Sequence, residues 1–316
     1  MSAAIEVYMG REQAWHQLGI VTGREFSVSD MIEQAPELVM PVTLMPTFVH
    51  LEDEFTWGGV KYVETPEKAA VVRADGKVVG EGLGKDSYGI VQPLEMLEWG
   101  DAISGRAGFP LISAGTIREG RQFFFTYDTG GITPGGLHVD THLTVCSSHD
   151  GTLAAMALHS TTVVVCANTL AMAISNTSDR TSLKHTSQVT DRLEATIRAI
   201  HDQHEHKDEV KETIQNLMSI QVRNFTPLLD GVLPIMDGTS AKKRENARSA
   251  VRGLLRSPVT EGFENTGWAA VQAINTWEQW GAPIRGGSRA LRQFDSVVKG
   301  KQPLTDKMIE LVLASA

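Results

Sequence analysis

The chain has 316 residues, of which 41% are hydrophobic and 21% charged, and its formal net charge is −9. This composition is typical of a globular protein and excludes global disorder or a collagen-like structure. The two cysteines, Cys146 and Cys166, are too few for a disulfide framework or a four-cysteine zinc site. No apolar run approaches the ~18 residues of a membrane span, and residues 1–20 lack the apolar core of a signal peptide, so we expect a soluble, cytoplasmic protein without membrane contact.

The N-terminal segment, residues 1–50, contains one predicted helix. Its apolar spacing covers Val28–Ala35, and either Ser27 or Ser29 is the residue type that caps a helix start. Three prolines follow this helix and predict an extended stretch that connects it to the next part of the chain.

A core of strands and helices is expected over residues 51–186. The Asp75-Gly76 pair lies between two alternating runs and predicts a β-hairpin. A further strand is predicted at Tyr88–Val91, and Pro93 is placed to open a helix.

Successive strands dominate the second half of this core. They are predicted at Gln122–Tyr127, at Thr141–Ser147 and, as one long strand or two short ones, between Leu153 and Val165. A short helix is expected to follow at Leu170–Ser175. This order predicts an antiparallel β-meander with a helix packed on one face.

The last part of the chain, residues 187–316, has the apolar spacing of helices. A long helix is expected from about Val189 to Ile220. Further helices are predicted at Ala241–Arg256, Gly267–Trp280 and Thr305–Ala314. The fold class is therefore α+β, with a mainly helical C-terminal region.

Positive charge is concentrated in residues 241–301, which hold 11 basic and 5 acidic side chains although the whole chain is acidic. Arginines recur there every four residues and so follow one side of the predicted helix. Such a stripe can contact successive phosphates of a nucleic acid, and a solvated or subunit-bridging basic face is the alternative of equal weight. The candidate nucleic-acid-binding residues are Lys242, Lys243, Arg244, Arg248, Arg252 and Arg256, with Arg180, Lys184 and His185 in second rank.

Other sequence patterns could indicate a metal site, a catalytic cysteine or a phosphate-binding loop, but a structural role explains each of them better. His201, His204 and Glu205 share one side of a helix but lack the order of a known zinc motif. Cys146 and Cys166 each have a histidine nearby, yet both lie in apolar, strand-like runs where a buried thiol is inert. The glycine-rich stretches do not match a phosphate-binding loop. We therefore expect a non-enzymatic protein without metal, cofactor or catalytic residues.

Five short motifs occur in a specific order along the chain: Trp15-His16-x-Leu18-Gly19, Tyr88-Gly89-Ile90-Val91-Gln92-Pro93, Ser148-His149-Asp150-Gly151-Thr152, Val164-Val165-Cys166-Ala167-Asn168-Thr169-Leu170 and Lys184-His185-Thr186. From about residue 12 to the C-terminus, the chain resembles the phage/plasmid-like proteins of domain-of-unknown-function family 932. The resemblance implies a mobile-element protein in the cytoplasm of a bacterial host. It implies no particular activity and no catalytic residues.

A second, fold-level resemblance concerns Gln122–Ser175. Its order of strands and a helix is similar to the core of single-strand annealing recombinases of the RecT and Redβ kind, which form rings or filaments and hold single-stranded DNA in a basic groove. This implies a phage protein that binds single-stranded DNA and promotes annealing in recombination or replication, as a homo-oligomer (ring or filament) with a possible phage exonuclease as partner. The alternative is a host-interaction protein, for instance in counter-defence, that does not bind nucleic acid.

Overall fold

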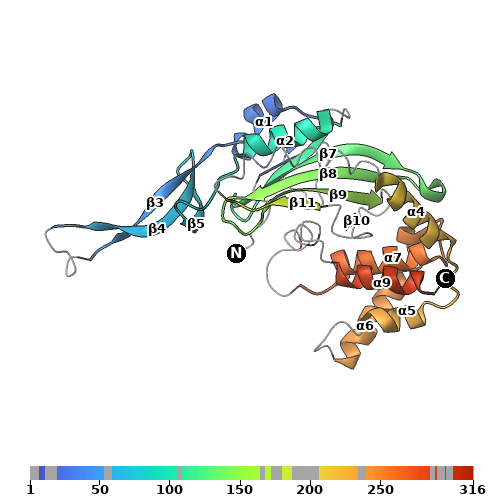
Figure 1. Cartoon of the computed structure of the whole chain (residues 1–316). Coiled ribbons are helices and arrows are strands. Elements are labelled where there is room, and N and C mark those ends of the chain that lie inside the picture. The colour runs from blue at the N-terminus through green and yellow to red at the C-terminus, as the bar shows by residue number, and fades with distance from the viewer. Residues whose placement is uncertain are drawn as a thin grey trace.

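The structure is a computed structural model that describes residues 7–10, 20–52, 59–105, 109–163, 168–171, 180–186, 206–233, 240–284, 289, 296 and 302–315. A large sheet with two helices on one face forms its middle, as Figure 1 shows. A smaller sheet projects from one end of the large sheet, and a group of helices lies at the other end. This α+β architecture, with helices gathered in the C-terminal region, confirms the predicted fold class.

The described elements comprise strands, helices and single turns. The strands are β1 (Val7–Gly10), β2 (Ile20–Val21), β3 (Val42–His50), β4 (Tyr62–Arg73), β5 (Val78–Gly84), β6 (Leu111–Ile117), β7 (Gln122–Ile132), β8 (Val139–Ser148), β9 (Ala155–Val163), β10 (Asn168–Ala171) and β11 (Arg180–Leu183). The helices are α1 (Val28–Gln34), α2 (Pro93–Gly105), α4 (His206–Ser219), α5 (Thr226–Val232), α6 (Ala241–Leu254), α7 (Gly267–Thr276) and α9 (Pro303–Leu313). Single turns are η1 (Pro36–Leu38), η3 (Pro134–Gly136), η7 (Pro258–Thr260) and the π-turn η8 (Trp277–Gly281).

The large sheet is an antiparallel meander with additions at both edges. Its strand order is β10-β9-β8-β7-β6-β1-β2, and β11 also pairs with β9. β6 to β9 are consecutive in sequence and adjacent in space, which confirms the predicted meander. β1 pairs antiparallel with β6 and parallel with β2, so the N-terminal segment closes one edge of the sheet.

The aromatic run of β7 divides its side chains between the two faces of the sheet, because successive strand residues point to opposite sides. Phe123, Phe125 and Tyr127 lie in the core that α1 and α2 cover. Phe124 lies with Cys146 in a separate buried cluster. Both faces of the meander are therefore packed, and Cys146 is a buried thiol, as expected from its apolar surroundings.

Tyr127 of the sheet hydrogen-bonds to helix α2. Its hydroxyl oxygen lies 2.8 Å from the Oδ1 atom of Asp101 and 3.1 Å from the carbonyl oxygen of Leu97, both on α2. Gly100 allows this approach, since a Cβ atom there would lie 2.5 Å from the tyrosine oxygen. Burial, together with the charge of Asp101, raises the pKa of Tyr127 well above its usual value, so the hydroxyl keeps its proton.

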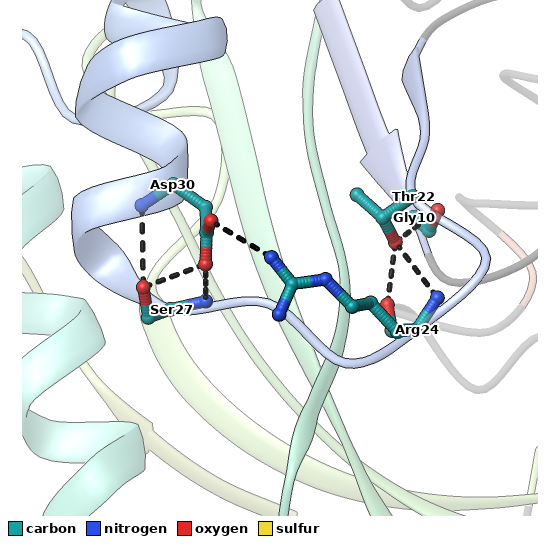
Figure 2. A network of polar contacts seen from close by, with 5 residues as sticks. All are labelled: Gly10, Thr22, Arg24, Ser27 and Asp30. Atoms are coloured by element: carbon teal, nitrogen blue, oxygen red, sulfur yellow. Dashed lines mark hydrogen bonds and ion pairs between the residues drawn. The ribbon is translucent and has the colours of Figure 1, made fainter.

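Helix α1 begins as its sequence predicts. The Asp30 N–H donates to Ser27 Oγ and the Ser27 N–H donates to Asp30 Oδ2, so the two residues cap the helix reciprocally (Figure 2). Arg24 reaches Asp30 at 3.5 Å from the turn held by Thr22, whose hydroxyl donates to the Gly10 carbonyl of β1. Ser27 is thus the cap, and the same network ties α1 to the sheet edge.

Two predicted elements are wrong. Tyr88–Val91 forms no strand, because its main chain bonds locally and to the segment after β11, with the Tyr88 N–H donating to Gly84 and the Gly89 N–H donating to His185. A helix was expected at Leu170–Ser175. Its first two residues instead belong to the strand β10 (Asn168–Ala171), which pairs with β9. The edge of β9 supplies main-chain partners that outweigh the local helix preference of Leu170 and Ala171. Residues 172–179 lie outside the described part.

The small sheet has the order β3-β4-β5, and the Asp75-Gly76 turn joins its last two strands as predicted. At its base, Val42, Val71 and Val79 form a small buried cluster. β5 passes so close to the turn between β8 and β9 that a Cβ atom at Gly80 would lie 2.2 Å from the carbonyl oxygen of His149. A residue larger than glycine would therefore separate the two sheets.

The C-terminal helices share one apolar core centred on the buried Trp268 of α7, and this core includes Ile132 and Val139 from the end of the β7–β8 pair. The predicted helices at 241–256, 267–280 and 305–314 correspond to α6, to α7 with η8, and to α9. Of the long helix expected from Val189, the structure describes α4, and residues 187–205 lie outside the described part. No helix among the described residues is long and apolar enough to cross a membrane.

A buried carboxylate caps the N-terminus of α9. Glu278 of η8 accepts hydrogen bonds from the Leu304 and Thr305 N–H groups and from the Thr305 hydroxyl. This side chain satisfies donors that the first turn of a helix leaves open. Burial and the nearby Glu278 charge raise the pKa of Asp306, in the same turn, to about 6.

We expect Tyr127→Phe to lower the free energy of unfolding by about 1–2 kcal/mol, because it leaves the buried Leu97 carbonyl and Asp101 without the hydroxyl. Asp101→Asn keeps an oxygen acceptor for Tyr127 and should cost less. Urea unfolding followed by circular dichroism measures both. Equal stability of Tyr127→Phe and the parent chain would show that apolar packing alone holds α2 on the sheet.

Candidate nucleic-acid interface

Helix α6 presents the basic stretch, and its other side anchors it. Ser240 caps its N-terminus by accepting from the Lys243 N–H at 3.4 Å. Ala247 and Val251, four residues apart, are buried against the C-terminal core. The remaining sides of α6 are polar, and most of its basic side chains are exposed. Figure 1 shows α6 at the outer end of the helical region.

Most of the positive charge on α6 is exposed. Lys242, Lys243, Arg252 and Arg256 are exposed, and Arg244 is half-buried. Among the residues that the structure describes, Lys242, Lys243, Arg244 and Arg256 form no ion pair. Four cations on one short segment therefore keep their charge available to a ligand.

Arg248 has a different role from its neighbours in the stripe. Its Nη2 atom lies 2.8 Å from Asp230 Oδ1 of α5, and its Nη1 atom lies 3.6 Å from Glu245. Its side chain is 27% exposed, and its Nε atom is buried without a hydrogen-bond partner. Arg248 thus joins α5 to α6, with much of its charge neutralised.

Glu245, on the same helix, also neutralises part of the positive charge of the arginine stripe. Besides Arg248, it accepts a hydrogen bond from Arg252 Nη1 at 3.4 Å, seven residues further on. This pair is solvent-exposed, so it is weak and a phosphate can displace it. The positive surface of α6 and of the turn after it therefore consists of Arg244, Arg252, Arg256 and the two lysines, rather than of the whole arginine series.

The second-rank candidates lie elsewhere. Arg180 belongs to β11 at the sheet, and Lys184 follows that strand with an exposed side chain. Figure 1 shows β11 and α6 in separate parts of the molecule. The structure therefore does not bring Arg180 and Lys184 together with the α6 residues.

His185 is part of an internal junction. Its Nδ1 atom lies 3.0 Å from the Gly89 carbonyl oxygen, and its Nε2 atom lies 3.2 Å from Ser147 Oγ and 3.1 Å from the Leu153 carbonyl oxygen. The ring also stacks on Tyr88 at 5.1 Å. A neutral ring has one N–H group and so can donate to only one of the two carbonyl oxygens; burial outweighs the two carbonyl contacts and lowers the pKa of His185. These contacts direct its ring nitrogens inward, away from a ligand.

Three of the sequence motifs meet at this junction. Tyr88 donates from its hydroxyl to the Ser148 carbonyl at 3.2 Å, and His185 reaches Gly89 and Leu153. The motifs containing Tyr88, His149 and His185 are therefore neighbours in space although they are far apart in sequence. Spacing alone could not reveal this meeting, because it depends on the pairing of β9 with β11.

The junction lacks the features of a hydrolytic site. Ser147 and His185 lie at hydrogen-bond distance, but Ser147 is fully buried, so a substrate cannot reach its hydroxyl. Cys146 lies in the cluster on one face of the sheet, whereas His149 stacks on Phe123 of the other face. Among the described residues, no group of three His, Cys, Asp or Glu side chains could hold a metal ion. The patterns at Cys166 and at His201, His204 and Glu205 lie outside the described part.

His149 is the most strongly shifted histidine of the junction. Its ring is buried and stacks on Phe123 at 4.9 Å. Burial and the nearby His185 lower the pKa of His149 from 6.5 to about 4. The folded protein therefore holds this ring neutral where an unfolded chain would protonate it.

We expect the contribution of His149 to the free energy of unfolding to fall by about 2 kcal/mol between about pH 7 and about pH 5. The sign follows from the lowered pKa, since the unfolded chain binds the proton first. His149→Phe should remove this part of the pH dependence, while Asp306, whose raised pKa acts in the opposite direction, contributes equally to both proteins. Urea unfolding at the two pH values gives the difference, and identical pH profiles would exclude His149 as its source.

Comparison with protein-family models matches residues 82–298 to the family described as Domain of unknown function (DUF932). Comparisons with curated proteins and with solved structures found no match. The family match begins within β5 and includes α6 and the four motifs from Tyr88 onward, and it extends over more than half of the chain. It does not include the first motif or β3 and β4, where we had expected the resemblance to continue. The chain belongs to the DUF932 family of proteins, whose defining domain has no known function.

Proposed function

We propose that the protein is a non-enzymatic phage protein that binds single-stranded DNA through α6 and promotes annealing in recombination or replication. The observation that supports this best is the cluster of unpaired cations on α6 in a chain whose net charge is −9. A local field of this sign attracts phosphate although the protein as a whole repels it. Lys242, Lys243, Arg244, Arg252 and Arg256 are the proposed phosphate ligands.

The geometry of α6 suits a single strand. Residues four apart on an α-helix are ~6 Å apart along its axis, close to the spacing of successive phosphates in an extended strand. Arg244 and Arg252, two such steps apart, can therefore contact phosphates two nucleotides apart. Phosphate contacts carry no base information, so we expect binding without strong sequence preference.

Annealing requires two strands to be presented together, which a homo-oligomer such as a ring or filament provides. A phage exonuclease that generates single strands is the matching partner in this proposal. The resemblance to annealing recombinases rests on the order of elements alone and is weaker support than α6, because no solved structure matches and the helix that we expected after the meander is a strand at its start.

A host-interaction protein without nucleic-acid binding is the second candidate function. The pairing of Arg248 and Arg252 with acidic neighbours favours it, since these contacts reduce the charge that a phosphate backbone would need. The two functions differ in their response to salt, because each phosphate contact releases a counterion.

We expect Arg244→Gln/Arg252→Gln to weaken binding of a single-stranded oligonucleotide and to reduce the slope of log affinity against log salt by about 1.4, at ~0.7 per phosphate contact. Fluorescence anisotropy over a series of salt concentrations measures the slope. Glutamine keeps the helix preference of the sites, so the fold should be unchanged.

Two further variants serve as controls. Lys61→Gln/Lys68→Gln removes the same charge from β4 and the residue before it, which lie apart from α6, and should leave the slope unchanged. Arg248→Gln should lower stability more than it lowers affinity, because it breaks the contact between α5 and α6. Equal slopes for the parent chain and Arg244→Gln/Arg252→Gln would favour the host-interaction function.

A further inference from the structure

Glu245 lies within the arginine stripe and is the single acidic residue of α6. It precedes Arg248 by three positions and Arg252 by seven, so the three side chains lie on one side of the helix. Its Oε2 atom lies 3.6 Å from Arg248 Nη1, and its Oε1 atom lies 3.4 Å from Arg252 Nη1. The carboxylate therefore bridges two arginines, with one oxygen directed to each.

This arrangement resembles the way in which a phosphate group bridges two guanidinium groups. Carboxylate and phosphate oxygens both accept charge-assisted hydrogen bonds from arginine N–H groups. A phosphate that approaches Arg252 therefore meets a donor that already has an acceptor. A phosphate that binds another N–H group of the same side chain lies close to the carboxylate of Glu245, and the two like charges repel each other.

The competition concerns Arg252 more than Arg248. Arg248 also pairs with Asp230 of α5 at 2.8 Å, a contact that does not involve Glu245. The side chain of Arg252 is 43% exposed, and within the described part of the chain Glu245 is the acid with which it pairs. Displacement of Glu245 therefore makes one further arginine available on the surface of α6.

The contact between Glu245 and Arg252 is weak enough to exchange. Both side chains are largely exposed, and exposed ion pairs contribute little to stability. The three cations at the start of α6, Lys242, Lys243 and Arg244, can hold one part of a strand and so raise the local concentration of its next phosphates near Arg252. A strand that is already attached there can therefore displace Glu245.

We propose that Glu245 is an internal competitor of the bound strand, which occupies Arg252 in the free protein and gives way to a phosphate of a strand held by the rest of α6. This inference rests on the proposed function of α6. Glu245 limits the lifetime of the complex, because it returns to Arg252 when the phosphate leaves. A strand that has been annealed must leave the protein that presented it, and weak attachment favours this release.

Glu245→Gln tests the inference on the full chain. We expect the variant to bind a single-stranded oligonucleotide about two- to fivefold more tightly than the parent at low salt, which is the range of one exposed ion pair. The gain should decrease as the salt concentration rises, because salt screens the contact between Glu245 and Arg252. Fluorescence anisotropy measures both affinities, and matching circular dichroism spectra show that the variant is folded.

The kinetics separate a local competitor from a general effect of charge. A local contact acts mainly on dissociation, whereas the field of the whole surface acts mainly on association. We therefore expect Glu245→Gln to release the oligonucleotide more slowly than the parent, with a similar association rate, in stopped-flow measurements. A gain that lies entirely in faster association would overturn the proposal.

Glu261→Gln is the matched control. Glu261 follows η7, the turn that comes after α6, and it is exposed and forms no ion pair among the residues that the structure describes. The change removes the same charge from the same helical region without releasing an arginine, so the affinity should stay close to that of the parent. Equal gains for Glu261→Gln and Glu245→Gln would show that net charge alone limits binding, and the competitor role would be wrong.

A double-mutant cycle locates the effect at one arginine. In the Arg252→Gln background, Glu245→Gln should gain less affinity than it does in the parent, because the two residues act as a pair. The same gain in both backgrounds would contradict this inference alone, provided that Arg244→Gln/Arg252→Gln still reduces the salt slope. If neither the parent nor Glu245→Gln binds oligonucleotide, the proposed function is wrong together with this inference.

Discussion

The antiparallel pairing of β7 with β8 is the constraint on which the rest of the molecule depends. The ladder runs from Gln122 opposite Ser148 to Ile132 opposite Val139. At the first end, the turn after β8 contacts the small sheet and the segments that carry Tyr88 and His185. At the second end, Ile132 and Val139 enter the core of the C-terminal helices. One hairpin thus connects the small sheet to the basic helix.

Opposite ends of this hairpin carry surfaces of opposite character. The β3–β4 ribbon carries exposed apolar side chains and an excess of negative charge, whereas α6 is basic, so the two surfaces suit different partners. The motif junction lies on the sheet, where His149 and Ser147 are buried and His185 hydrogen-bonds inward.

Local electrostatics determine how much of the arginine stripe is available. Arg248 follows the same spacing of four as the other arginines, but it forms an ion pair with Asp230 of α5. Glu245 forms ion pairs with both Arg248 and Arg252. A half-buried guanidinium whose charge is paired with two carboxylates contributes less to the surface field than an unpaired one. The number of basic residues in a segment is therefore larger than the number available to bind phosphate. The exposed lysines at the start of α6 are accordingly stronger candidate ligands than the paired arginine.

The sequence by itself determined the elements whose cause is local. Ser27, one of two candidate caps, begins α1, Pro93 opens α2, Asp75-Gly76 turns the hairpin, and the phenylalanine-rich run at Gln122–Tyr127 forms a strand, because each depends on residues within a few positions. The basic face of α6 was likewise predictable from its spacing of four. Tertiary structure alone decided that the segment at Leu170 is a strand, that β1 closes the sheet edge, that His185 points inward and that Arg248 is paired. These outcomes depend on partners tens of residues away, such as β9 for β10 and Asp230 for Arg248, and local propensity is too weak to oppose main-chain pairing or a facing charge.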